Sequence, residues 1–415
     1  MPHLEEKLTI QNLKQLSERF GNAFYILDSE QFSDNYKELK NEFQKRYPNF
    51  NIAYSYKTNY IPKLCMIVDK MDGYAEVVSD MEMEIARRCG VSASHIIWNG
   101  PVKNRNKIEE LLISGGTVNI DNISEAKQIE EIASEYKKHL LNVGLRCNFD
   151  VKDGVQSRFG FDVDGRSFGE VCRMICNTHN LHLRGIQCHF AKRKVEFWPE
   201  RAKGMLKIYD ELRKRYDLTV DWIDIGGGLY GKMPEELMLQ LGCESSGYEA
   251  YAEASADLFF EKFKSNGPEL FIEPGSALVG DCVKFVVRVE NIREIRGKSI
   301  AVVLGSQKNI SMTGINPPMD VIDGGEDRKR YSDIDIAGYT CIESDVLYRH
   351  YNGEIGVEDF LVFSNCGSYS VVMKPPFIMP NFPILDISNG VKNVEVIKRA
   401  ETFDDLFGTY SFDHI

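Results

Sequence analysis

Side chains suited to covalent and acid–base chemistry follow short β-branched runs in the first two-thirds of the chain. Lys57 comes at the end of AYSYK, His189 follows IQC, and Glu273 follows LFI. A lysine at the end of a buried strand can be desolvated, which lowers its pKa and suits it to forming a Schiff base. An acidic residue that faces a pyridine nitrogen keeps it protonated and makes the ring an electron sink. Taken singly, each residue also fits an ordinary surface or turn position.

Three consecutive glycines, Gly226, Gly227 and Gly228, follow the run WIDI. Such a loop lets backbone N–H groups approach a phosphate closely. The spacing does not match the GxGxxG pattern of dinucleotide-binding folds, which argues against a dinucleotide. The glycines therefore indicate either a tight turn or a phosphate cradle.

The elements that must position these residues form a repeating pattern from about residue 50 to 280. In each repeat a short predicted strand is followed by a predicted helix. The strand-like runs are NIAYSY, AEVVS, HIIWNG, TVNIDN, LNVGLRCNF, LRGIQCHF, TVDWIDIGGG and ELFIEPG. Alternation of this kind indicates βαβ units and a parallel sheet. Eight strands fit an α/β fold of the (β/α)8 barrel type, in which functional groups gather at the carboxyl ends of the strands. A doubly wound open sheet is the alternative.

After Gly280 the repeating strand–helix pattern ends, and the sequence becomes rich in strand-like runs. We therefore assign residues 36–280 to a barrel, and residues 1–35 together with 281–415 to a mostly β domain. The run AFYILDSEQF near the amino terminus could supply a strand to this second domain. The polar stretch 306–333 is rich in glycine and proline, which predicts an exposed loop.

Composition excludes several classes of protein. The 415 residues carry a net charge of -12, which disfavours a nucleic-acid partner. No window approaches the roughly 18 uninterrupted apolar residues of a membrane span, and the charged amino terminus lacks a signal-peptide core. We therefore expect a cytoplasmic protein with no membrane partner. The ten cysteines contain no CxxC pair, so we expect free thiols and no metal site.

Nine motifs together resemble a known family. They are AYSYKTN, AEVVSDME, IIWNGPVKN, SRFGFD, GIQCHF, IDIGGG, IEPGSALVG, GYTCIESDVL and NCGSYS. Their order and spacing resemble the fold-type III decarboxylases that depend on pyridoxal 5'-phosphate, a family that includes diaminopimelate, ornithine/arginine and carboxynorspermidine decarboxylases, with alanine racemase more distant. The resemblance covers about residues 20–410 and implies an alanine-racemase-like barrel with a carboxyl-terminal β domain.

The resemblance also implies roles for individual residues. Lys57 would hold the cofactor covalently, Glu76 would lie beneath it, His189 would stack on its ring, and Glu273 would pair with its ring nitrogen. The remaining cofactor-binding residues would be Gly226, Gly227, Gly228, Gly275, Ser276 and Tyr369, with Tyr369 reaching the phosphate. Cys341 would come from the second subunit of a homodimer and donate a proton after carbon dioxide leaves. Catalysis would thus involve Lys57, His189 and Cys341, and substrate binding would involve Cys341, Glu343 and Asp345.

Several positions depart from the family pattern. The usual HxGS is replaced by a run from His189 to Lys192, HFAK, and EPGR is replaced by EPGS. No arginine occurs between Lys298 and Arg328, where diaminopimelate decarboxylases carry a second substrate-binding arginine. Bidentate carboxylate clamps require arginine. Ile342 replaces the acidic residue that contacts a distal amine, and isoleucine accepts no hydrogen bond.

These observations predict a homodimeric enzyme that removes the α-carboxylate of an amino acid. Because the substrate-reading positions are altered, we expect a non-standard carboxylated intermediate in natural-product, siderophore or polyamine biosynthesis. A diaminopimelate or ornithine/lysine-type decarboxylase with a rearranged pocket is the first alternative, and racemisation ranks below it. A catalytically silent regulatory homologue is the alternative outside the enzymes.

Overall fold

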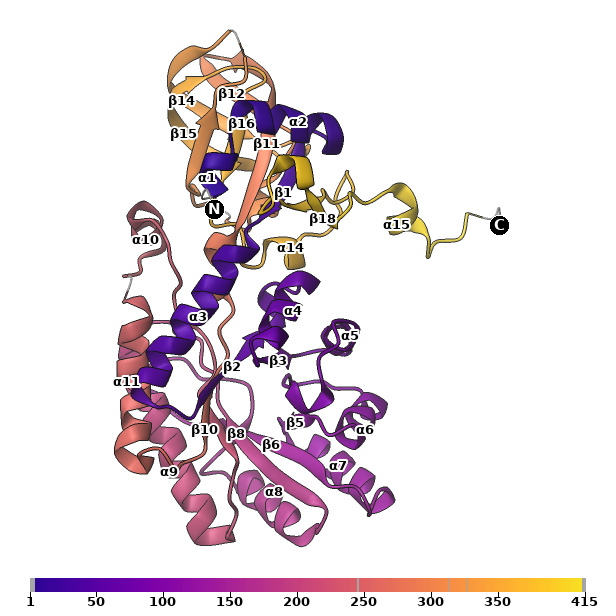
Figure 1. The fold of residues 1–415 in the computed structure, drawn as a ribbon, viewed down its shortest axis with the longest axis vertical. Helices are drawn as coiled ribbons and strands as arrows, with labels where there is room; N and C mark the ends of the chain where they lie inside the picture. Colours follow the sequence, from indigo (N-terminus) through magenta and orange to yellow (C-terminus); the bar gives the residue numbers. More distant parts are fainter. Residues whose placement is uncertain (1–3, 245, 313, 326, 413–415) are drawn as a thin grey trace. The chain divides into compact units, whose positions relative to one another are not determined.

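The computed structural model describes residues 4–244, 246–312, 314–325 and 327–412 (Figure 1). The chain divides into two compact units. The barrel unit comprises Ser33–Gly231 and Ser245–Leu278, and the β unit comprises Met1–Phe32, Lys232–Glu244 and Val279–Ile415.

The barrel unit contains a closed ring of eight parallel strands. The strands are β2 (Phe50–Ser55), β3 (Tyr74–Val77), β4 (Ile96–Trp98), β5 (Thr117–Ile120), β6 (Leu141–Asn148), β8 (Leu181–Gln187), β9 (Trp222–Asp224) and β10 (Glu269–Ile272), with the short β7 (Phe161–Asp162) beside β6. Pairing of β10 with β2 closes the ring. The predicted (β/α)8 barrel is therefore confirmed, and the open sheet is excluded.

Helices lie outside this ring of strands (Figure 1). They are α3 (Ser29–Arg46, of which Ser33 onward belongs to this unit), α4 (Pro62–Lys70), α5 (Asp80–Arg88), α6 (Arg105–Ile113), α7 (Ile123–Glu135), α8 (Arg166–Asn177), α9 (Trp198–Tyr216) and α11 (Gly247–Phe263), with α12 (Ser276–Val279) at the end of the unit. Two of the strand-to-helix turns are fixed by caps. The Ser79 hydroxyl accepts a hydrogen bond from the Glu82 N–H, and the Asn122 side chain accepts one from the Glu125 N–H. These caps begin helices α5 and α7 at defined residues. They thereby fix the turns that join β3 to α5 and β5 to α7.

The inside of the ring is filled by large apolar side chains. Trp222, Phe271 and Ile97 belong to one buried cluster. Gly185 on β8 makes room for it, because an added Cβ would lie 2.1 Å from the Trp222 ring. The barrel is thus a packed core, and polar groups collect at the ends of its strands.

The β unit contains a nine-stranded mixed sheet. Its strands are β1 (Ala23–Leu27), β11 (Val283–Ile295), β12 (Lys298–Val303), β13 (Met319–Ile322), β14 (Lys329–Ala337), β15 (Val346–Ile355), β16 (Phe360–Phe363), β17 (Ile384–Asp386) and β18 (Glu395–Lys398). Its helices are α1 (Leu4–Lys7), α2 (Ile10–Phe20), α10 (Glu235–Leu241), α13 (Gln307–Ile310), α14 (Ser370–Met373) and α15 (Phe403–Phe407). The amino-terminal β1 pairs with β11, and α2 buries Leu13 and Leu16 against the sheet core. Residues from both ends of the chain therefore share this core.

The prediction of an exposed loop over 306–333 is wrong in part. Residues 307–310 form α13, and β13 and the start of β14 also fall in this stretch. Ser306 and Asn309 are buried, and each accepts a hydrogen bond from the other's backbone in a capping box. Polar composition therefore does not indicate exposure here, since the polar groups are satisfied inside the unit.

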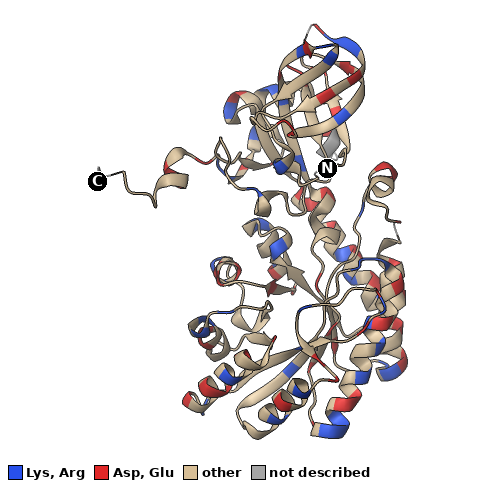
Figure 2. Cartoon of the chain, turned by 180° about the vertical axis from the view of Figure 1, so that it is seen from behind, with Lys and Arg blue, Asp and Glu red and all other residues tan. Residues whose placement is uncertain are grey.

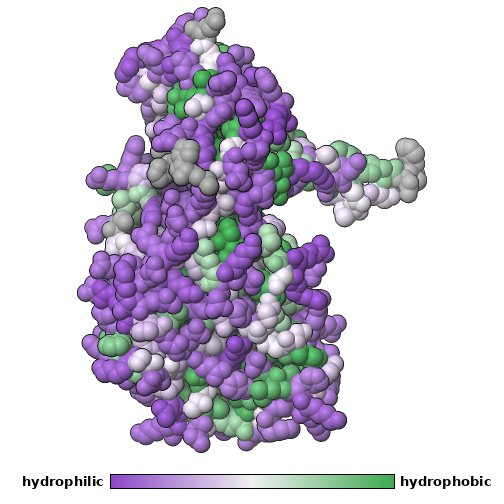
Figure 3. Space-filling model, in the orientation of Figure 1, coloured by the Kyte–Doolittle hydropathy of each residue, from purple (hydrophilic) through white to green (hydrophobic). Residues whose placement is uncertain are grey.

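The surface and the cysteines are those of an ordinary globular protein. Acidic and basic residues are interspersed over the outer helices of the barrel (Figure 2), and hydrophilic residues cover most of the face seen in Figure 3. All ten cysteines are free, and seven of them are buried. Among the described residues, no helix is long and apolar enough to cross a bilayer.

Candidate active site

A lysine and a glutamate meet where two neighbouring strands of the barrel end. Lys57 lies in a short 3-10 turn, Tyr56–Thr58, directly after β2, and Glu76 lies on β3. The Lys57 Nζ donates to the Glu76 Oε2 at 2.7 Å. Glu76 is fully buried, whereas the Lys57 side chain is 35% exposed. The amine is therefore held at a fixed point and remains accessible.

Three donors surround the Glu76 carboxylate. Besides Lys57, the Ser55 hydroxyl donates at 2.6 Å and the Asn99 amide at 2.9 Å. Burial by itself would raise the pKa of Glu76, but the charge and hydrogen bond of Lys57, together with Ser55 and Asn99, lower it below its usual value. Glu76 is therefore an ionised carboxylate that holds the Lys57 amine in place.

Asn99 links this pair to a second buried carboxyl group. It follows β4, and its amide nitrogen also donates to Glu273 Oε1 at 2.5 Å. Gln187, the last residue of β8, donates to the same oxygen at 3.1 Å. Burial, and then the nearby Glu76 carboxylate, raise the pKa of Glu273 to about 7. Glu273 thus lies in a site where a positive partner would be strongly favoured.

His189 is held by the glycine loop. Its Nδ1 accepts a hydrogen bond from the Gly227 N–H at 3.1 Å and lies 3.8 Å from Glu273 Oε2. Burial, and then the positive charges of Lys57 and Arg201, lower the pKa of His189 well below its usual value. The imidazole is therefore neutral, and because Nδ1 accepts, its proton lies on Nε2.

Two of the three glycines in the loop have no space for a side chain. An added Cβ would lie 2.2 Å from the Cys188 carbonyl oxygen at Gly226 and 2.1 Å from the Glu273 carbonyl oxygen at Gly227. Gly228 has a φ of +85°, which glycine tolerates best. Among the described residues, none accepts a hydrogen bond from its N–H. The loop therefore exposes its backbone without side chains, and at least one of its N–H groups, that of Gly228, is left to donate a hydrogen bond.

A buried arginine lies under this loop. Arg201, in α9, is fully buried and donates to the carbonyl oxygens of Gly227 at 2.7 Å and Lys192 at 2.6 Å. No carboxylate of the described residues lies within ion-pair distance of it. A Cβ on Gly228 would lie 3.9 Å from its Nη2. The loop therefore carries a buried positive charge that has no anionic partner within the barrel unit.

Gly275 and Ser276 follow Glu273 and close the same end of the barrel unit. An added Cβ on Gly275 would lie 2.0 Å from the Thr58 hydroxyl oxygen, so the chain passes against the turn that carries Lys57. Ser276 begins α12.

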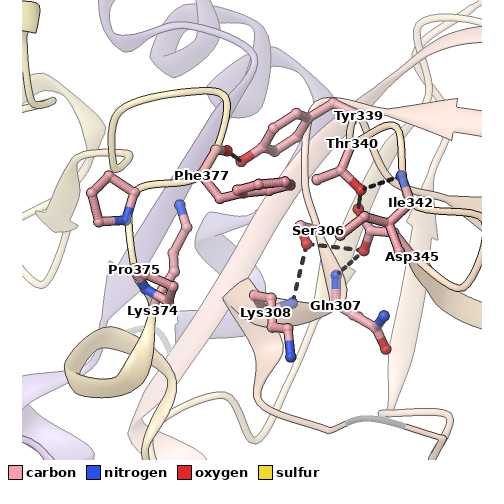
Figure 4. Close-up of a pocket in the computed structure, with 11 residues that line it drawn as sticks. Ser306, Gln307, Lys308, Tyr339, Thr340, Ile342, Asp345, Lys374, Pro375 and Phe377 are labelled. Carbon is pink, nitrogen blue, oxygen red and sulfur yellow. Dashed lines mark hydrogen bonds between the residues drawn. The ribbon is translucent and has the colours of Figure 1, made fainter.

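The other predicted site residues belong to the β unit. Tyr369 precedes α14 with a φ of 59°, an uncommon conformation for a tyrosine that is often found at functional sites. Cys341 and Glu343 are exposed on the turn after β14. Asp345 is buried, and its carboxylate accepts hydrogen bonds from Ser306 and Gln307 and from the Thr340 hydroxyl (Figure 4). Asp345 therefore fixes the turn that carries Cys341.

Three polar residues of this cluster have no predicted role. Asn99 directly follows the strand-like run IIW, a position that the sequence already marks as informative, and Gln187 ends a strand by the same rule. Arg201 gives no such signal, because it lies within a charged amphipathic helix where a solvent-facing arginine is the ordinary expectation.

The comparisons with known proteins decide the family. Residues 33–280 match the family described as pyridoxal-dependent decarboxylase, pyridoxal binding domain. The chain belongs to the pyridoxal-phosphate-dependent decarboxylases. It is an enzyme of the carboxy-lyase class and uses pyridoxal phosphate.

The relatives of this decarboxylase agree over nearly their whole length. Diaminopimelate decarboxylase of Methanothermobacter thermautotrophicus is 26% identical over 94% of this chain and 92% of the relative. An L-glutamyl-[BtrI acyl-carrier protein] decarboxylase of Niallia circulans is 24% identical over 95% of each chain. The crystal structure of diaminopimelate decarboxylase from M. jannaschii has the same fold, with a TM-score of 0.85 and 23% identity, covering 96% of this chain and 94% of that one.

The residues of the barrel unit fit the cofactor. The glycine loop leaves a cradle, Arg201 lacks an anion, and Glu273 favours a cationic partner. The Gln187 Oε1 and Asn119 Oδ1 atoms are buried without a hydrogen-bond partner among the described residues. Such groups are ordinarily satisfied, and a bound polar molecule or an ordered water would supply the donors they need.

Proposed function

We propose that this decarboxylase removes the α-carboxylate of a non-standard amino acid, a carboxylated intermediate of natural-product, siderophore or polyamine biosynthesis. The observation that carries the catalytic part is the continuous hydrogen-bonded cluster from Lys57 through Glu76 and Asn99 to Glu273. The altered substrate positions support the non-standard substrate, as does the relative named for a carrier-bound glutamyl group.

Each of the predicted site residues would have a separate role in binding the cofactor or in moving a proton. Bound pyridoxal phosphate supplies an aldehyde for a lysine amine and a protonated ring that accepts the electron pair left when carbon dioxide departs. Glu76 holds the Lys57 amine in place, and Glu273 keeps a proton on the ring nitrogen. His189 offers a neutral ring face, and the glycine loop with Arg201 holds the phosphate. Cys341 donates the proton that replaces the carboxylate.

A diaminopimelate or ornithine/lysine-type decarboxylase is the second candidate, favoured by several relatives that are named diaminopimelate decarboxylase. Carbon dioxide release from diaminopimelate, ornithine, lysine, arginine and carboxynorspermidine, compared with larger carboxylated conjugates, separates the two. We expect the conjugates to be preferred. A kcat/KM of about 10⁴ M⁻¹s⁻¹ or more for diaminopimelate or ornithine would instead establish the second candidate.

Replacing Arg201 should weaken binding of the phosphate group specifically. In Arg201→Met the buried charge under the glycine loop is lost, and a charged hydrogen-bonding group contributes about 1.5–3 kcal/mol. We expect the Kd for pyridoxal phosphate, measured by absorbance titration, to rise roughly 10- to 100-fold. The Kd for pyridoxal, which lacks the phosphate, should change little. Equal losses for both ligands would show that Arg201 only supports the fold.

The proposed homodimer with shared sites predicts subunit complementation. Lys57→Ala and Cys341→Ala should each be inactive, but a mixed dimer carries one site in which neither residue is replaced. Exchange of subunits should therefore restore part of the activity. Differently tagged chains allow heterodimers to be isolated and assayed directly. Heterodimers without activity would show that both residues act within one chain, and an active Cys341→Ala homodimer would show that Cys341 has no role.

A further inference from the structure

Two cysteine thiols lie beside each other on α4 and α5, neighbouring helices of the barrel unit (Figure 1). Cys65 lies on α4, which follows the turn of Lys57, and Cys89 is the residue at which α5 ends. The Cys89 Sγ lies 3.7 Å from the carbonyl oxygen of Pro62, the first residue of α4. In a helix a side chain leans back over the preceding turn, so the Cys65 side chain lies near that carbonyl. The two thiols accordingly hydrogen-bond to each other.

The two thiols have different environments. Cys65 is fully buried, whereas Cys89 is partly exposed. Burial, and then the hydrogen bond to Cys89, raise the pKa of Cys65 well above its usual value, so this thiol keeps its proton and donates it. The same hydrogen bond lowers the pKa of Cys89, against the smaller effects of partial burial and Asp69. Cys89 is therefore the thiol that forms a nucleophilic thiolate more readily, and Cys65 is placed to react with it next.

A tyrosine connects this pair to the turn that carries the catalytic lysine. Tyr56 precedes Lys57 in the chain and is buried, and its hydroxyl donates a hydrogen bond to the Cys65 sulfur. Tyr56, Cys65 and Cys89 thus form a chain in which each group donates to the next. Helix α5 in turn follows β3, the strand that carries Glu76. A change in the spacing of α4 and α5 therefore acts on the elements that position the Lys57 amine.

We propose that Cys65 and Cys89 form an oxidation site, at which hydrogen peroxide converts the two thiols to a disulfide and thereby weakens cofactor binding. The Cys89 thiolate attacks one peroxide oxygen, the O–O bond breaks, and the products are a sulfenic acid on Cys89 and a hydroxide ion, which takes up the proton that the thiol lost. The Cys65 sulfur then attacks the Cys89 sulfur, the S–O bond breaks, and the departing hydroxide takes the Cys65 proton. One peroxide thus accepts two electrons from the two thiols and yields two water molecules.

The disulfide would act on the turn of Lys57 through α4. Bonded sulfur atoms lie closer together than hydrogen-bonded ones, so α4 must move toward the end of α5. The buried Tyr56 hydroxyl is bonded to the sulfur that moves, and α4 begins soon after the Lys57 turn. A small displacement of a group that must meet its reaction partner in one geometry has a large effect. We therefore expect the Kd for pyridoxal phosphate to be about tenfold higher in the oxidised protein.

Peptide mapping of the peroxide-treated holoenzyme tests the site. Alkylation and digestion without reductant should yield one pair of peptides linked through Cys65 and Cys89, and dithiothreitol should release it. In Cys65→Ala, Cys89 should instead be recovered as the sulfenic acid or a higher oxide. Cys176→Ser is the matched control and should form the linked pair, because Cys176 is exposed but donates to a backbone carbonyl oxygen instead of a thiol. Recovery of Cys89 as a free thiol, or linked to another cysteine, would overturn the site.

The effect on cofactor binding is measured separately, by absorbance titration with pyridoxal phosphate. Activity is not a suitable readout, because peroxide also oxidises accessible thiols such as Cys341, the proposed proton donor. The increase in Kd on oxidation should occur in the wild type and in Cys176→Ser, disappear in Cys89→Ser and be reversed by dithiothreitol. Equal Kd values for the oxidised and reduced wild type would refute the link to the Lys57 turn. An increase that persists in Cys89→Ser would refute it as well, since another oxidised residue would then be responsible.

Discussion

Lys57→Met is expected to lower the rate of carbon dioxide release at least about 10³-fold, because the variant has no amine to bind the cofactor covalently. The Glu76 carboxylate would also lose its cation. Since the Lys57 side chain is about one-third exposed, we expect a stability loss of only about 1–2 kcal/mol. Activity and thermal unfolding of the same preparations measure the two effects.

Lys57→Arg is the matched control for that variant. Arginine keeps a positive charge beside Glu76, so stability should stay near that of the wild type. A guanidinium cannot replace the amine in the covalent step, so activity should remain as low as in Lys57→Met. If Lys57→Arg retained a tenth of the wild-type rate, the covalent role of Lys57 would be refuted.

Glu273→Gln is expected to have opposite effects on activity and stability. The amide oxygen can still accept the hydrogen bonds of Asn99 and Gln187, but it cannot stabilise a proton on the ring nitrogen. We expect carbon dioxide release to fall by roughly 10²- to 10⁴-fold. The unliganded variant should be more stable than the wild type at pH 8 by on the order of 1–3 kcal/mol, because it buries no second carboxylate beside Glu76.

The pH dependence of this stability difference has a defined sign. The pKa of Glu273 is about 7 in the folded protein and near 4.5 when unperturbed. Between these values the folded state binds more protons than the unfolded state, so this group makes the wild type less stable as pH rises from about 4.5 to 7. Glu273→Gln should lack that change. Denaturant titrations of both unliganded proteins at pH 5 and pH 8 test it. A variant that is less stable than the wild type at pH 8 would contradict the buried carboxylate pair.

The barrel is visible in the sequence because its strands are buried on both faces. Runs such as NIAYS read as continuous apolar and β-branched segments, and all eight predicted runs are strands of the ring. The segment 306–310 could not be predicted as buried, since its burial depends on hydrogen bonds to Asp345, a residue 35 or more positions away.

Site residues can be predicted from the sequence only where the fold determines their position. Lys57, His189 and Glu273 follow strands, and a barrel brings such positions together, so their proximity follows from the sequence pattern. Arg201 and Lys374 obey no rule of this kind. Arg201 is buried without an anionic partner, and Lys374 is buried without a hydrogen-bond acceptor among the described residues. Both are properties of packing, and each sequence neighbourhood also fits an exposed, solvated side chain.

Borohydride reduction of the native holoenzyme, followed by peptide mapping, tests most directly whether the barrel cluster is the catalytic centre. Reduction should fix pyridoxal phosphate on the peptide that contains Lys57 and abolish carbon dioxide release in proportion to labelling. Three buried lysines should remain unlabelled: Lys103, Lys284 and Lys374. Stoichiometric labelling of any lysine other than Lys57 would contradict the account.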